Sequence, residues 1–140
     1  MKKWISFTLA CCLLIVGGCS DQNIVPKKEA ANVVDTYGIT KFHVTIETKE
    51  EKKALEASFA EKKERSEAEY LNKKQEVALH GKKALEKITK AFDKMDLDPE
   101  AEETELVKKV AEGFGIKDYK MIRLEITFKG HDSKEIMFSK

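Results

Sequence analysis

Alternation of hydrophobic and polar residues marks one strand in the first half of the chain and two near its end. Apolar side chains occupy every second position over 42–46 and again over 122–128. A period of two places successive side chains on opposite faces of a strand. Ile136 and Phe138 repeat the pattern after the turn Gly130-His131-Asp132, which predicts a closing β-hairpin. Because the intervening residues are polar, each strand should have one buried and one solvated face.

Two segments between these strands show helical spacing instead. The first carries its apolar stripe at Leu85, Ile88, Phe92 and Met95. In the second, Asp98-Pro99 offers a capping side chain followed by proline at the first helical position. Its apolar stripe is Leu106, Val107, Val110, Ala111 and Phe114, and its end is marked by Gly113 and Gly115. The short connection between the two segments predicts that the helices pack as a hairpin.

The stretch 49–80 supports two interpretations. Its Ala, Glu and Lys content favours a long charged helix by intrinsic propensity. Leu55, Ala57 and Phe59, however, alternate with polar residues, and so do Ala68 and Tyr70. That alternation predicts a β-hairpin that turns at 62–65, although this turn contains neither Gly nor Asn. Pattern alone leaves both structures open.

The first nineteen residues have the layout of an exported segment. Lys2 and Lys3 precede an uncharged apolar run over 4–16, and two glycines lead to Cys19. The run is shorter than the roughly twenty residues that a membrane-spanning helix needs. The residues 16–19 resemble the lipobox of bacterial lipoproteins, which implies a signal peptide over 1–18, cleavage before Cys19, thioether lipidation of Cys19 and acylation of the new amino terminus, as with palmitate. An ordinary secretory signal, an uncleaved anchor and a cut before Cys11 are the alternatives.

The segment after Cys19 shows no clear period and carries Pro26 beside two lysines. We therefore expect a lipidated amino terminus and flexible tether over 19–36, followed by one domain over 37–140. The alternative is a short ordered arm that uses Val33 and Val34.

Charge and cysteine content narrow the class of function. The chain has 26 Lys and Arg residues against 25 Asp and Glu, and loss of residues 1–18 leaves 24 basic residues. Such a nearly neutral, mixed surface argues against a nucleic-acid partner, which would call for a basic patch. Cys11 and Cys12 would leave with the signal, and Cys19 would carry lipid. No thiol would then remain for a disulfide, a metal site or a nucleophile.

Candidate chemical groups are few. His43, His80 and His131 are far apart in sequence and form no metal-binding motif, so solvated positions are favoured over metal or general-base chemistry. The Lys- and Glu-rich runs at 49–53 and 61–67 could form a docking surface but are more typical of a solvated face. Three aromatic residues fit either an interface or ordinary packing: Tyr70, Tyr119 and Phe138.

Acidic residues gather around the start of the second helix. A calcium-binding loop would need a glycine where Ala101 stands and a closing glutamate where Val107 stands. Helix capping and complementation of the helix dipole explain the cluster better, with an ion site over 96–103 as the alternative. The cluster comprises Asp93, Asp96, Asp98, Glu100, Glu102 and Glu103.

Several short segments occur in a recognisable order behind the signal: F-H-V-T-I-E at 42–47, L-E-A-S-F at 55–59, A-E-Y at 68–70, G-K-K-A-L at 81–85 and A-E-E-T-E at 101–105. Together with the final hairpin they resemble the YusW-like lipoproteins of Bacillus-type bacteria, over about residues 38–140. The resemblance implies three N-terminal strands, two helices and two C-terminal strands, and so favours a hairpin over 54–72. The turn at 62–65 departs from the Asn-Gly-like chemistry of the family pattern. The family brings no established activity.

The sequence thus predicts an α+β fold, with an antiparallel sheet of about five strands packed against a helical hairpin. We expect a monomeric, non-enzymatic lipoprotein without cofactor or metal, held at the extracytoplasmic face of the cell membrane through Cys19. Its partner would be a protein, a peptide or a cell-envelope component. A small-ligand or ion-binding lipoprotein is the alternative, and a PepSY-like protease-modulating domain is a further one that rests on fold analogy.

Overall fold

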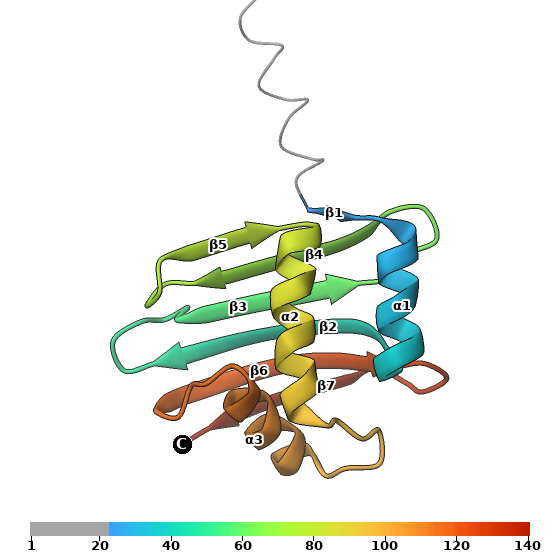
Figure 1. Cartoon of the computed structure of the whole chain (residues 1–140). Coiled ribbons are helices and arrows are strands. Elements are labelled where there is room, and N and C mark those ends of the chain that lie inside the picture. The colour runs from blue at the N-terminus through green and yellow to red at the C-terminus, as the bar shows by residue number, and fades with distance from the viewer. Residues whose placement is uncertain (1–22) are drawn as a thin grey trace, which may run out of the picture.

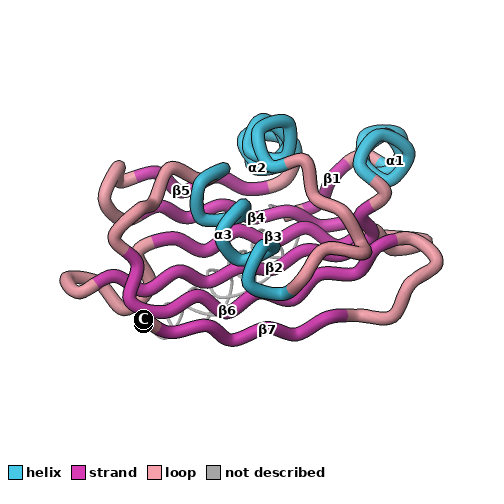
Figure 2. Tube along the Cα trace, turned by 90° about the horizontal axis from the view of Figure 1, so that it is seen from below, coloured by secondary structure: helices cyan, strands magenta, loops and turns pink. Residues whose placement is uncertain are grey.

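The computed structural model describes residues 23–140, which form an antiparallel sheet with three helices on one face (Figures 1 and 2). The other face of the sheet carries no helix of the described chain (Figure 2). In chain order the elements are β1 (Ile24–Val25), α1 (Lys27–Tyr37), β2 (Ile39–Thr48), β3 (Leu55–Ala60), β4 (Ser66–Asn72), β5 (Val77–His80), α2 (Lys82–Met95), α3 (Glu103–Gly113), β6 (Tyr119–Phe128) and β7 (Lys134–Ser139).

The sheet order is β1-β4-β3-β2-β6-β7, and β5 also pairs with β4. The two short strands β1 and β5 lie along the same side of β4, because β1 pairs with its first residues and β5 with its last ones. At the opposite edge stands β7, paired only with β6 among the described strands. The closing hairpin that the sequence predicts is thereby confirmed.

The core lies between the sheet and the helices. In β2 the side chains of Phe42, Val44 and Ile46 are fully buried, and in β6 those of Ile122 and Leu124 are as well. Register aligns Val44 with Leu124 and Ile46 with Ile122, so the apolar rows of neighbouring strands continue one another. This matches the alternation in the sequence, since the period-two rows face the helices.

The apolar stripes of α2 and α3 are buried as their spacing predicts. Phe92 of α2 packs edge-on against Phe42, with 5.0 Å between ring centroids. The two helices touch closely at Gly113, where a Cβ would lie 2.4 Å from the Cγ of Met95 and 3.2 Å from the carbonyl oxygen of Ala91. A glycine at this helical position therefore lets α3 approach α2.

The open choice over 49–80 resolves in favour of the hairpin, since β3 and β4 pair in register from Leu55–Asn72 to Ala60–Glu67. Its turn lacks Gly and Asn, and Ser66 takes over the role of a turn-forming residue. The buried Ser66 hydroxyl accepts a hydrogen bond from the Lys62 amide at 3.1 Å and lies 3.3 Å from the Lys62 carbonyl oxygen. One side chain thus closes the turn from inside the strand.

The sheet and the helical layer are both larger than expected. The sheet has seven strands instead of about five, because β1 and β5 add to the edge of β4. Three helices cover it instead of a two-helix hairpin. The sequence pattern does not predict β5, because its four residues are partly buried or exposed and form no continuous apolar row.

The expected tether is wrong for the residues that the structure describes. Residues 24–25 lie in β1 and residues 27–36 in α1, and α1 packs its buried residues Ala30, Val33 and Val34 onto the fold. Gly38 ends the helix in the left-handed conformation, with φ of 69°. The ordered-arm alternative was therefore nearer to the structure, and the domain begins before residue 37.

The expected start of the second predicted helix is also wrong. α3 begins at Glu103, and its N-cap residue Glu102 makes no side-chain capping bond. Asp98 instead accepts a hydrogen bond from the Glu100 amide at 2.8 Å within the preceding loop. That loop is held from elsewhere in the fold, because the Lys134 ammonium donates to the Pro99 carbonyl at 2.6 Å and the Lys109 ammonium to the Asp96 carbonyl at 3.2 Å.

Candidate functional site

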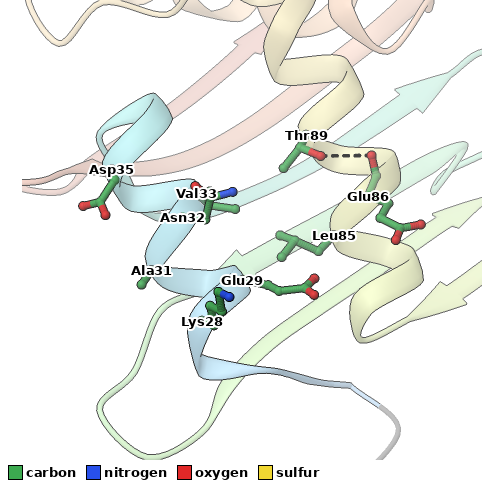
Figure 3. A pocket seen from close by; sticks show the side chains of 9 residues that line it. All are labelled: Lys28, Glu29, Ala31, Asn32, Val33, Asp35, Leu85, Glu86 and Thr89. Atoms are coloured by element: carbon green, nitrogen blue, oxygen red, sulfur yellow. Dashed lines mark hydrogen bonds between the residues drawn. The ribbon is translucent and has the colours of Figure 1, made fainter.

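A groove of about 650 Å³ runs between α1 and α2 on the helical face (Figure 3). Its apolar floor includes Val33 and Leu85, and Figure 3 shows Leu85 reaching from α2 toward α1. The walls are mostly polar, and their charged residues are three acids and one lysine. The remaining lining residues are Lys28, Glu29, Ala31, Asn32, Asp35, Glu86 and Thr89.

An ion pair spans the groove at the start of α2. Glu29 of α1 lies 3.0 Å from the Lys82 ammonium, and Figure 3 shows the Glu29 side chain directed toward α2. The hydrogen bond and charge of Glu29 raise the pKa of Lys82 above its usual value. Because the Lys82 side chain is exposed, this pair joins the two helices without a large contribution to stability.

A second polar contact joins the helices farther along. The Tyr37 hydroxyl donates a hydrogen bond to the Asp93 carboxylate and lies 3.4 Å from the Thr89 carbonyl oxygen. Burial, the hydrogen bond to Asp93 and the negative charge of that carboxylate raise the pKa of Tyr37 from 10.0 to about 12. The Tyr37 ring also packs edge-on against Phe92 at 5.3 Å. Tyr37 therefore remains a neutral hydrogen-bond donor at physiological pH.

A second cleft, of about 630 Å³, lies on the other side of α1, and we call it the basic cleft. It is formed by α1, the β3–β4 turn and the β6–β7 turn. Four lysines line it against two acids, so its formal net charge is +2. Its lining residues are Lys27, Ala31, Val34, Asp35, Thr40, Glu61, Lys62, Lys63, Ser66 and Lys129.

The face of the sheet that carries no helix is polar, and ion pairs join its neighbouring strands. Lys41 contacts Glu125 on β6 at 2.5 Å, and the His43 ring contacts Glu56 on β3 at 3.1 Å. His43 thus occupies the solvated face that its strand pattern predicts. These pairs join three neighbouring strands but line neither of the two clefts.

The other histidines lie apart from His43. His80 ends β5 and contacts the Asn23 amide oxygen at 2.6 Å, while that amide's nitrogen donates to Glu69 at 3.2 Å. Register places His80 three strands away from His43, which is about 14 Å at ordinary strand spacing. His131 stands in the β6–β7 turn against the ring of Phe128. The fold therefore brings no two histidines together.

The acidic residues separate into different structural roles. Asp93 bonds to Tyr37, Asp98 braces its own loop, and Asp96 ends α2 in the left-handed conformation with φ of 48°. Among residues 23–140, no three His, Cys, Asp or Glu side chains are arranged to hold a metal ion. Cys19, the predicted lipidation site, lies outside the described residues.

The three aromatic residues that fit either an interface or ordinary packing make ring contacts with other residues of the fold. Tyr70 is 2% exposed and its ring lies 6.2 Å from that of Phe114, which supports core packing. The Tyr119 and Phe138 rings lie 6.2 Å apart and are tilted by 60°, and the Lys140 ammonium lies 4.2 Å from the centroid of the Tyr119 ring. The run 61–67 contributes to the basic cleft, whereas the run 49–53 lies in the loop at the opposite end of β3.

The α1 residues that wall both clefts were missed as site residues, because this segment was assigned to a tether. A signal was present: Ala30, Val33, Val34 and Tyr37 follow the spacing of one helical face. Gly38 directly after them is a typical helix end. The lysines of the basic cleft come from three distant segments, so their convergence has no local signature.

The fold and clefts define an α+β domain with a one-sided helical layer and open surface grooves. In the described part of the chain, no helix is both long and apolar enough to cross a membrane. The family described as YusW-like protein matches residues 40–130, and the chain belongs to this family. No curated protein and no solved structure matches the chain significantly. The match runs from β2 into the β6–β7 turn, so α1 lies outside it.

Proposed function

We propose that this protein is an extracytoplasmic lipoprotein, anchored to the cell membrane through Cys19, that acts as a non-enzymatic binding module. The observation that carries the proposal is the lipobox-like sequence over 16–19 behind a charged start and an apolar run. Its cysteine precedes the first described residue, Asn23, by only four positions. An extended chain of that length spans at most about 14 Å, so a lipid on Cys19 would hold the domain close to the bilayer.

The anchor is tested by changing its cysteine. Cys19→Ser should leave the signal attached or release the protein from the membrane, because residues 20–140 contain no comparable apolar run. Detergent-phase partitioning and mass spectrometry of the amino terminus measure both outcomes. Cys12→Ser is the matched control and should leave processing unchanged. A wild-type amino terminus that begins elsewhere and carries no lipid would overturn the anchor.

The binding role is supported by the groove between α1 and α2. It combines an apolar floor with hydrogen-bonding groups on both walls, as surfaces that bind an extended protein segment do. Its lining includes three acids, Glu29, Asp35 and Glu86, and one lysine, Lys28, and this negative balance favours a segment with basic or amide groups. A protein or peptide of the cell envelope is therefore the occupant that we propose.

Site-specific crosslinking in intact cells tests this role. A photoreactive residue at Asn32, on the groove wall, should give a discrete crosslinked species, and one at Lys74, in the β4–β5 loop, should not. Thr89→Arg would place a bulky cation in the groove and should abolish the species formed from position 32. Equal crosslinking from positions 32 and 74 would contradict a groove-specific partner.

A further inference from the structure

The basic cleft stands at the end of the domain where the amino-terminal chain enters the fold. Val25 pairs with Ser66 at the start of β4, and Ser66 in turn braces the turn that carries Lys62 and Lys63. Lys27 follows two residues after Val25. The point where the described chain enters the fold, at Asn23–Val25, therefore lies beside the basic cleft.

The point where the chain enters the fold is fixed. The Asn23 carbonyl accepts a hydrogen bond from the Ala68 amide at 2.9 Å, and its side chain contacts both Glu69 and His80. From Asn23 to Lys27 the chain can span at most about 14 Å. If Cys19 is held at a bilayer, as the proposed function requires, Lys27 lies within about 28 Å of it, so the cleft can reach the headgroups.

The cleft has cations that the fold itself does not neutralise. Lys62 pairs with Glu67 at 3.4 Å. Within residues 23–140, however, Lys27, Lys63 and Lys129 form no salt bridge, and all three are exposed. The cleft thus gathers three exposed lysines without a salt bridge, on a chain that is nearly neutral overall.

We propose that the basic cleft binds the phosphate groups of anionic phospholipids in the membrane that carries the protein. Lysine ammonium groups near an anionic bilayer are attracted to its surface, and the attraction falls off within a Debye length of about 8 Å at physiological salt. A lipid on Cys19 and an electrostatic contact at the cleft would together fix how the domain faces the membrane. This inference rests on the proposed anchor only for the orientation, because the cleft can be tested without lipid.

The experiment uses the mature chain, residues 19–140, with Cys19→Ser, so that no acyl chain contributes. The chain should sediment with vesicles that contain phosphatidylglycerol and not with vesicles of phosphatidylcholine alone, and added sodium chloride should release it. Lys27→Gln, Lys63→Gln and Lys129→Gln together should weaken binding by about tenfold or more. These side chains are exposed, and unchanged circular dichroism would confirm that the variant is folded.

A matched control removes the same charge from the far end of the sheet. Lys52, Lys53 and Lys74 lie in the β2–β3 and β4–β5 loops, about 20 Å or more from the cleft by strand rise. Their combined change to Gln should alter binding by less than about twofold, since they lie beyond the Debye length. An equal loss in the two triple variants, or equal binding to both kinds of vesicle, would overturn the lipid contact.

Two further outcomes would separate the lipid contact from a site for free phosphate and from the anchor at Cys19. Inorganic phosphate that displaces the chain from vesicles at low millimolar concentration, where sodium chloride of equal ionic strength does not, would indicate a site for free phosphate and overturn the assignment to lipid. Absence of lipid on wild-type Cys19 would overturn the anchor but not the vesicle result. The two proposals therefore fail independently.

Discussion

The two faces of the sheet are built from the same strands but are stabilised by different interactions. Toward the helices, Phe42 and Val44 are fully buried and their neighbours across the strands are apolar as well. Toward solvent, Lys41 and His43 alternate with them and pair with carboxylates on adjacent strands. The covered face gains free energy by removing apolar area from water, about 25 cal/mol per Å². The open face gains little, because exposed ion pairs contribute only up to about 1 kcal/mol each.

The largest expected effect comes from uncovering part of the inner face. A chain that begins at Gly38 would lose β1 and α1, and with them the buried residues Val25, Ala30, Val33 and Val34. At about 1.5–3 kcal/mol for each buried valine, the loss of roughly 5 kcal/mol is comparable to the whole stability of a small domain. Urea denaturation of chains starting at Asn23 and at Gly38 measures it. Equal stability would show that α1 is dispensable.

A matched pair on β6 compares the two faces directly. Leu124 is fully buried against the helices, whereas its neighbour Glu125 faces solvent and pairs with Lys41. Leu124→Ala should cost about 2–5 kcal/mol because it leaves a cavity. Glu125→Ala should cost less than about 1 kcal/mol. Free energies of unfolding from urea titration test both, and similar costs at the two positions would contradict the division between the faces.

The same division explains how much of the fold the sequence predicts. Strands β2 and β6 were predicted because their inner rows are apolar and their outer rows polar over several residues. The same alternation in β3 and β4 left a long helix open as well, and only the family resemblance favoured the hairpin. β5 was missed because it is short and half exposed. α1 was missed although its buried residues follow helical spacing, because lysines and Pro26 at its start are also typical of a tether.

The candidate site was less predictable than the fold. The Asp98-Pro99 pair has the local chemistry of a helix start, yet Lys134 and Lys109 hold that loop from distant elements, so α3 begins later. Likewise, Lys63 and Lys129, which both line the basic cleft, are 66 positions apart in the sequence. Contacts of this kind depend on the folded topology, and no local pattern carries them.

Two buried polar residues, Ser66 and Asn72, lie on the inner face, one at each end of β4. Each bonds to an adjoining turn, Ser66 to Lys62 and Asn72 to the Gln75 amide at 3.1 Å. Ser66→Ala should cost about 1–2 kcal/mol, because the turn loses the hydrogen bonds that its Gly-free sequence depends on. Ser58→Ala, on the open face of β3, is the control and should be nearly neutral. Thermal melting compares them, and equal effects would contradict this role of Ser66.

Tyr37, at the rim between the helices, adds a pH-dependent contribution. Its pKa of about 12 in the folded state lies above its usual value of 10.0, so the folded protein holds the phenolic proton more tightly than the unfolded chain does. The resulting stability is fully present below pH 10 and is lost as the pH rises toward 12. Tyr37→Phe should remove this part of the alkaline destabilisation. The wild type should also show the absorbance change of one phenol near pH 12, and the variant should lack it. Identical alkaline profiles of the two proteins would refute the link between Tyr37 and Asp93.

The smallest expected effect lies at Asp98, outside both faces of the sheet. If Asp98 were a helix N-cap, Asp98→Ala would lower the free energy of unfolding by about 0.5–2 kcal/mol. Because Asp98 is exposed and braces only its own loop, we expect about 0.5 kcal/mol or less, the low end for a solvated hydrogen bond. Asp98→Asn keeps the accepting oxygen and should be nearly neutral. Millimolar calcium should leave the melting temperatures of the wild type and both variants unchanged. A rise of several degrees that Asp98→Asn and Asp96→Asn abolish would instead support the ion-binding alternative at residues 96–103.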